Sequence, residues 1–67
     1  MIDGSDRIEW DNVEVVRDAG RVLICRVGGT MVGVSVPRML PGTTIARTGD
    51  CGRLILAREV ALNLGLV

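Results

Sequence analysis

The feature that most constrains the fold of this chain is the segment RVLICRVGGTMVGVSV, residues 21–36. Residues 21–27 are a nearly continuous aliphatic run, which is typical of a strand covered on both faces. Over residues 31–36, valines alternate with Met, Gly and Ser, which is the period of a half-buried strand. The Gly-Gly-Thr sequence between the two runs favours a tight turn. The sequence therefore predicts an antiparallel β-hairpin over residues 21–36.

A strand is also expected before this hairpin, with a break in its alternation. Ile8 and Trp10 share one parity, whereas Val13 and Val15 share the other. The change of parity at residues 11–12 indicates a bulge or a tight turn. The sequence RDAG that follows favours a reverse turn over residues 17–20, with a positive φ at its glycine.

Turns interrupt the segment after the hairpin. Pro37 and Pro41 donate no backbone hydrogen bond, so they end the second strand of the hairpin in a corner or a short 3₁₀ turn. Brief strands are expected over residues 43–47 and 53–57, with a turn between them. Apolar residues then recur at helical spacing, which predicts a helical turn closed by Gly65. These apolar residues are Ala57, Val60, Ala61 and Leu64.

Together these elements predict a mainly β fold: a small antiparallel β-barrel or rolled sheet of four to five strands with a short C-terminal helix. The connections are too short for parallel crossovers. With 67 residues, the chain has room for one core, so residues 7–67 are expected to form a single small β domain. Residues 1–6 are polar and contain glycine, so a flexible N-terminus is expected there.

Two short segments of the sequence are similar to each other, AGRVLICR at residues 19–26 and CGRLILAR at residues 51–58. The similarity fits an internal repeat, and it equally fits two buried strands that each follow a turn in an arginine-rich chain. Under both interpretations, Gly20 and Gly52 are expected in turns, and the arginine after each glycine begins a strand.

The sequence GRLILAREVALNLGL, residues 52–66, resembles the strand-to-helix core of the AbrB/MazE-type swapped-hairpin DNA-binding family. The pattern of that family is Gly-Arg, an aliphatic strand, a basic residue, Glu, and a helix ending in Leu-Gly-Leu. Ala57 stands where the family usually has proline, and the strands that follow the helix in that family have no counterpart here. The resemblance implies a dimer that contacts DNA through Arg47, Arg53 and Arg58.

A longer stretch, residues 32–67, is similar to small phage and mobile-element proteins of unknown function. The similarity rests on VSVPRMLPGT, on the GDCG turn, and on the aliphatic strand that leads to LNLGLV. It implies an origin in a mobile element and no particular mechanism.

Apolar residues make up 48% of the chain, nearly all of them aliphatic, with Trp10 as the single aromatic residue. This is more aliphatic surface than a lone domain of this length easily buries, so a homodimer or another homo-oligomer is expected. Trp10 fits either a place in the core or an exposed anchor in an interface.

The formal net charge is zero, but the charges are divided along the chain. Residues 1–18 hold six carboxylates and two arginines, a balance of −4, and residues 19–67 hold six arginines and two carboxylates, a balance of +4. The acidic segment either folds over the basic part or faces a different neighbour. The basic excess is small for a duplex binder, and stacking aromatics are lacking, so nucleic acid is not the favoured partner.

The sequence contains no pattern typical of catalysis or of metal binding. Histidine is absent, so no imidazole base is present to activate Cys25 or Cys51, and a zinc site is not expected. Cys25 is expected to be a small buried residue. Asp50 is expected to cap a turn and Glu59 to favour the first turn of a helix. We therefore predict no catalytic residue, no cofactor and no metal.

These features predict a non-enzymatic protein-interaction module, in its specific form a phage or mobile-element effector that acts on a host protein or nucleoprotein. One alternative is a dimeric AbrB-like DNA-binding regulator or antitoxin, and another is a small ligand-binding barrel or enzyme with a site between subunits. The absence of a membrane-spanning run and of a signal-peptide pattern predicts a cytoplasmic protein with reduced thiols. The residues expected to take part in interactions are Trp10, Arg38, Arg47, Arg53 and Arg58.

Overall fold

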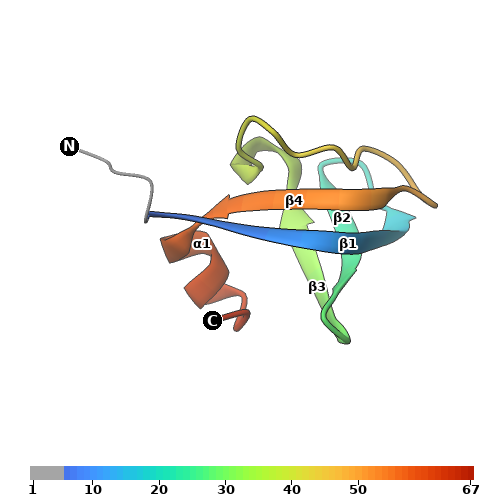
Figure 1. Ribbon diagram of the computed structural model, residues 1–67. Coiled ribbons are helices and arrows are strands. Elements are labelled where there is room, and N and C mark those ends of the chain that lie inside the picture. The colour runs from blue at the N-terminus through green and yellow to red at the C-terminus, as the bar shows by residue number, and fades with distance from the viewer. Residues whose placement is uncertain (1–5) are drawn as a thin grey trace.

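A computed structural model describes residues 6–67 (Figure 1). The strands form one antiparallel sheet in the order β3-β2-β1-β4, followed by a short C-terminal helix, which confirms the predicted mainly β fold. The sheet stays open and does not close into a barrel. The flexible N-terminus predicted over residues 1–6 lies outside the described residues, except for Asp6. In chain order the elements are β1 (Arg7–Asp18), β2 (Val22–Val27), β3 (Thr30–Ser35), the 3₁₀ helix η2 (Val36–Arg38), β4 (Cys51–Ala57) and α1 (Arg58–Asn63).

The predicted hairpin is present as β2 and β3. Its register runs from Val22 opposite Ser35 to Val27 opposite Thr30. Gly28 and Gly29 form the two-residue turn with φ values of 55° and 85°. Positive φ at both turn positions is what a type I′ hairpin requires, and glycine adopts it without a steric penalty.

Strand β1 has 12 residues, and its pairing is interrupted by two irregularities. The register with β4 shifts between Trp10 and Val13, around Asn12, which has a φ of 59°. This confirms the bulge predicted from the change of parity. A second shift lies between Val15 and Arg17 in the pairing with β2. The strand therefore pairs with β4 along its first part and with β2 along its second part.

The turn predicted over residues 17–20 starts later than expected, because β1 continues to Asp18. Gly20 has the expected positive φ, 91°, and its N–H donates to Oδ1 of Asp18 at 2.9 Å. Asp side chains commonly stabilise turns by accepting a hydrogen bond from the backbone N–H two residues later. The turn is therefore stabilised by Asp18 together with Gly20.

The strand predicted over residues 43–47 is absent, and the segment instead lies along the outer edge of β4. Pro41 cannot donate, and the chain turns at Gly42 (φ 102°), so a regular ladder cannot continue. Only isolated backbone bonds form, from the N–H of Leu40 to the carbonyl of Ile55 and from the N–H of Thr44 to the carbonyl of Arg53, both at 2.9 Å. This loop nevertheless covers the edge.

Gly52 is not in a turn, contrary to the expectation from the similarity of the two segments. It lies within β4, opposite Val13, and Arg53 is the third residue of that strand rather than its first. A Cβ at Gly52 would collide with Oγ1 of Thr44. Glycine is therefore required here by the close approach of the loop and not by a turn conformation.

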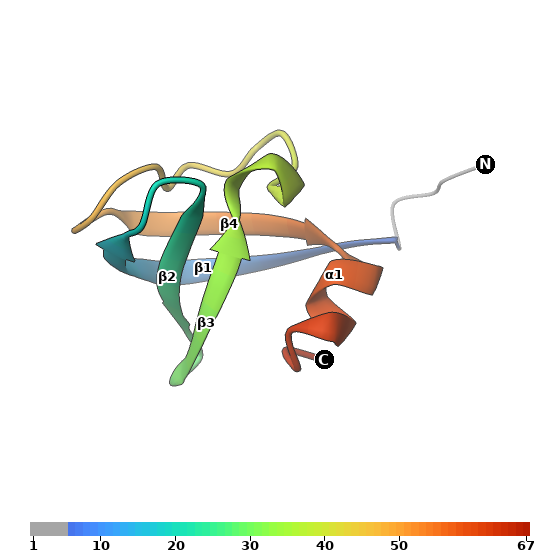
Figure 2. The ribbon, with the colours of Figure 1, turned by 180° about the vertical axis from the view of Figure 1, so that it is seen from behind.

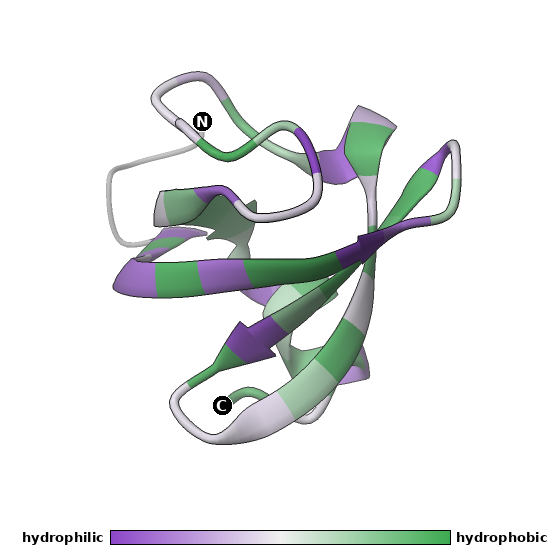
Figure 3. Cartoon of the chain, turned by 90° about the vertical axis from the view of Figure 1, so that its right-hand side faces the viewer, coloured by the Kyte–Doolittle hydropathy of each residue, from purple (hydrophilic) through white to green (hydrophobic). Residues whose placement is uncertain are grey.

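The core lies on the concave side of the sheet, and every strand contributes to it. Figure 3 shows the alternation of apolar and polar residues along the strands that produces this core. The buried cluster contains Val13, Val15, Leu23, Cys25, Val27, Val32, Val34, Ile45, Leu54 and Leu56, and Trp10, Met39, Val60, Leu64 and Leu66 pack against it. Trp10 is half-buried, which places it at the margin of the core.

Helix α1 follows β4 directly and ends as the sequence predicts. Gly65 has a φ of 77°, its N–H donates to the carbonyl of Leu62, and the N–H of Leu66 donates to the carbonyl of Ala61 at 2.9 Å. These two bonds form a Schellman motif, which satisfies carbonyls at the helix end. No helix in residues 6–67 has both the length and the apolar character needed to cross a bilayer.

Replacing Leu54 with alanine is expected to reduce the free energy of unfolding by about 2–5 kcal/mol, because a fully buried side chain leaves a cavity. That is a large part of the stability of a chain of this length. Leu62→Ala is the control, since Leu62 is 56% exposed, and a change within about 0.5 kcal/mol is expected. Urea unfolding monitored by circular dichroism measures both, and equal effects would contradict this core assignment.

Candidate interaction surface

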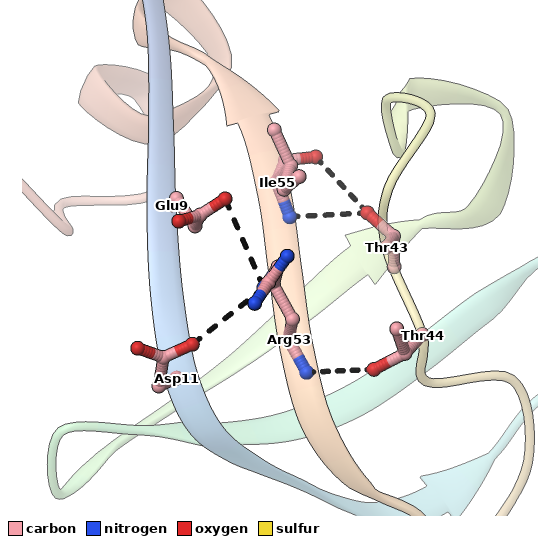
Figure 4. Close-up of polar contacts among 6 residues, drawn as sticks. All are labelled: Glu9, Asp11, Thr43, Thr44, Arg53 and Ile55. Atoms are coloured by element: carbon pink, nitrogen blue, oxygen red, sulfur yellow. Dashed lines mark hydrogen bonds and ion pairs between the residues drawn. The ribbon is translucent and has the colours of Figure 1, made fainter.

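The acidic residues of β1 form ion pairs with arginines of both neighbouring strands. Nε of Arg53 lies 3.8 Å from Oε2 of Glu9 and 3.6 Å from Oδ1 of Asp11 (Figure 4). On the other side of β1, Nη1 of Arg26 lies 3.0 Å from Oε1 of Glu14. Each pair is about half exposed, so its contribution to stability is small. The acidic segment thus folds against the basic part of the chain, which is one of the two arrangements expected from the charge division.

The structure does not bring the four candidate arginines together. Arg53 lies in the middle of β4 between the carboxylates of β1. Arg47 belongs to the loop before β4 and Arg58 begins α1 after it, so the seven residues of β4 separate them. At about 3.3 Å per residue that separation is roughly 20 Å. Arg38 ends η2 and lies near Ala57, at the end of β4 where α1 begins. These positions give no single basic patch.

Arg38 does line a groove, which lies between β3 and α1. Gly33 and Ser35 form the β3 wall, and Arg38 and Ala57 lie at the end where β4 meets the helix. Figure 2 shows the two elements, β3 and α1, whose residues line this groove. Its volume is about 300 Å³. The α1 wall consists of Glu59, Val60, Asn63 and Leu64.

The groove has few ionisable side chains. Its ionisable residues are Arg38 and Glu59, and it contains no cysteine or histidine. Cys25 is buried in the core, where burial raises the pKa of its thiol, and Cys51 is exposed at the start of β4. Within residues 6–67 no three His, Cys, Asp or Glu side chains are grouped so as to hold a metal ion.

The edge of β3 that borders the groove is open. Strand β2 lies on one side of β3, and no strand of the described chain lies on the other. The N–H of Val36 donates to the carbonyl of Arg21 at 2.8 Å. Because opposite pairs in an antiparallel ladder alternate, this bond fixes the pattern along β3. The N–H and C=O groups of Met31, Gly33 and Ser35 therefore point away from β2, toward the open edge.

The other edge of the sheet, on β4, is covered by threonine side chains. The N–H of Ile55 donates to Oγ1 of Thr43 at 3.0 Å, and the N–H of Arg53 donates to Oγ1 of Thr44 at 2.8 Å (Figure 4). These hydroxyls take the place of ladder partners where the loop backbone cannot. The sheet therefore has one protected edge and one open edge.

Apolar side chains surround the open edge on the convex face of the sheet. Met31 is 50% exposed, and Val22 and Ile24 are half-buried on the same face. A Cβ at Gly33 would lie 3.2 Å from Cγ1 of Val22 and 3.5 Å from Cδ1 of Ile24. Gly33 has no positive φ, so glycine here serves to leave room for these two side chains.

The open edge of β3 was not predicted from the sequence, because strand order is a long-range property. A usable signal was nevertheless present: residues 30–35, TMVGVS, contain no charge and no proline. Edge strands usually carry one of these to prevent pairing with other chains.

Thr43→Val is expected to reduce the free energy of unfolding by about 1–3 kcal/mol, because it leaves the N–H of buried Ile55 without its acceptor. The Ile55 amide is also expected to exchange faster with deuterium. Thr48→Val, at an exposed loop position, is the matched control and is expected to change neither quantity. An unchanged Ile55 exchange rate in Thr43→Val would contradict the role of the hydroxyl.

Asp50 caps the loop before β4, as predicted. Its Oδ2 accepts from the N–H of Ala46 at 2.7 Å and of Arg47 at 2.9 Å. The N–H of Arg47, followed by that of Ala46, holds the pKa of the Asp50 carboxyl below its usual value. A lowered folded-state pKa means that the stabilisation is complete above the unfolded pKa of about 3.9 and is lost as the pH falls through the folded pKa.

Asp50→Asn is therefore expected to lower the Tm at pH 7, and the difference from the wild type is expected to shrink in strong acid, where the wild-type carboxyl is protonated as well. Differential scanning calorimetry between pH 2 and pH 7 measures this. Asp11→Asn, which changes an exposed carboxylate on β1, is the control. A difference in Tm that stays constant across the pH range would contradict the capping role.

Comparison of the chain with protein-family models, with curated proteins and with solved structures finds no match. Function has therefore to be inferred from the geometry of the described residues.

Proposed function

We propose that this chain is a non-enzymatic interaction module that binds by strand addition at the open edge of β3. In strand addition, an extended segment joins the edge of a sheet through main-chain hydrogen bonds, and neighbouring side chains give specificity. The observation that carries the proposal is the contrast between the two edges, since β4 is covered by a loop and β3 is not.

The surroundings of the edge support this mode of binding. The outward N–H and C=O groups of Met31, Gly33 and Ser35 supply the main-chain partners. Val60 and Leu64 on the opposite wall of the groove supply apolar contacts. Glycine at the centre of the edge strand allows another backbone to approach closely.

The distribution of charge favours contacts with protein over contacts with phosphate. Two carboxylates lie within 4 Å of Arg53, so a phosphate would have to compete with them. Of the other candidate arginines, Arg47 lies before β4 and Arg38 and Arg58 lie near its opposite end, whereas duplex binding draws on several phosphate contacts from one face.

The test uses an edge variant, Met31→Pro. The N–H of Met31 points away from β2, so proline removes an edge donor without removing a bond of the β2–β3 ladder, and edge positions tolerate proline. Association, either with proteins captured from a cell extract or with a second copy, is expected to fall at least tenfold. The variant Leu62→Lys, on the exposed side of α1, is expected to bind as the wild type does.

Circular dichroism and urea unfolding verify that both variants are folded. A second edge variant, Ser35→Asp, tests the same surface without proline, because a charge at the edge opposes pairing. The proposal is overturned if no association of either kind depends on the two edge positions.

A further inference from the structure

We infer that the strand that pairs with β3 is β3 of a second copy of this chain, antiparallel to the first, with Gly33 opposite the partner's Gly33. This inference rests on the proposed function, because it names the occupant of the edge. The three outward-facing residues of β3 carry it: they are spaced symmetrically about Gly33.

The hydrogen-bonding groups of two such edges match completely. Each copy presents the N–H and C=O of Met31, Gly33 and Ser35. A two-fold axis at Gly33 places Met31 opposite the partner's Ser35 and Ser35 opposite the partner's Met31. Three donors and three acceptors from each copy then form six bonds, and none of these groups is left over. The two sheets become one continuous eight-stranded sheet.

The side chains of the edge fit the same arrangement. On the convex face, the exposed Met31 would lie beside the partner's Ser35 and the partner's Gly33, where small residues leave space for it. No residue of β3 is charged, so the symmetric pairing brings no like charges together. The zero net charge of the chain also removes long-range repulsion between copies.

The end of the groove receives a part of the partner that has no side chains. In this register, the partner's Gly28 and the partner's Gly29 lie beyond Ser35, next to Arg38. No ion pair holds Arg38 within the described residues. Arg38 lines this end of the groove, so its guanidinium can donate to carbonyl oxygens of the partner's turn. A foreign peptide would have no reason to carry a glycine turn at that point.

Cysteine cross-linking tests the register directly. In a Cys51→Ser background, Met31→Cys and Ser35→Cys are prepared as separate proteins. Residues 31 and 35 of opposite copies form a hydrogen-bonded pair with Cα atoms about 5.5 Å apart, which a disulfide can bridge. Two copies of residue 31 are four positions apart along the strands, about 13 Å, which is too far.

Oxidation of the mixture is therefore expected to give the mixed disulfide, and oxidation of either protein alone is expected to give at least tenfold less cross-linked product. Sedimentation velocity of the wild type, from about 10 to about 500 µM, is expected to show twice the mass of one chain. Met31→Pro and Ser35→Asp are expected to raise the dimer Kd at least tenfold, and Leu62→Lys is expected to leave it unchanged.

The possible failures are distinguishable. A wild type that is monomeric throughout this range overturns the self-pairing, while capture of another protein that depends on Met31 and Ser35 would leave the proposed function standing. The self-pairing is also overturned if neither edge variant changes the dimer Kd. It is overturned as well if each cysteine variant alone gives as much cross-linked product as the mixture of the two, because the interface then lies elsewhere.

Discussion

The rest of the structure depends on the bulge in β1 at Asn12. In a regular strand, Ile8 and Trp10 would point to one face of the sheet and Val13 to the other. Some of these apolar side chains would then face water. The residue in left-handed conformation resets the phase and bends the strand. One strand can therefore pair with β4 on both sides of the bulge, from Arg7 to Glu14, and with β2 from Glu14 to Asp18, and its apolar side chains reach one core.

The two edges of the sheet reflect two different ways of satisfying backbone polar groups. At β4, a loop too irregular to form a ladder satisfies them with the hydroxyls of Thr43 and Thr44. At β3, the corresponding groups face a groove. Burial of such groups without partners is costly, so the first edge is completed within the chain, and the second can be completed by solvent or by another strand.

The elements predicted correctly depend on local signals. The hairpin, the bulge, the helix and its glycine end each arise from residues close together in the sequence. The strand predicted over residues 43–47 failed because Pro41 and Gly42 break the ladder, and threonine side chains replace it in a way that composition does not reveal. The prediction that Gly52 lies in a turn was wrong, because glycine is required there by a tertiary contact with Thr44. The positions of the arginines and the identity of the edge strands depend on strand order, which is a long-range property, although the lack of charge and proline in residues 30–35 is a local sign of an unprotected edge.

The pairing of β1 with β4 also has a consequence for the order of folding. It joins Arg7 to Ala57, whereas the β2–β3 hairpin closes through two residues. Closing a long loop costs more entropy, so the meander β1-β2-β3 is expected to form first, and φ-values at Val34 above those at Leu54 would support this order. During synthesis β4 emerges after β1, β2 and β3. Until β4 pairs with it, β1 is itself an exposed edge, so β4 is the strand that protects this side of the sheet from pairing with other chains.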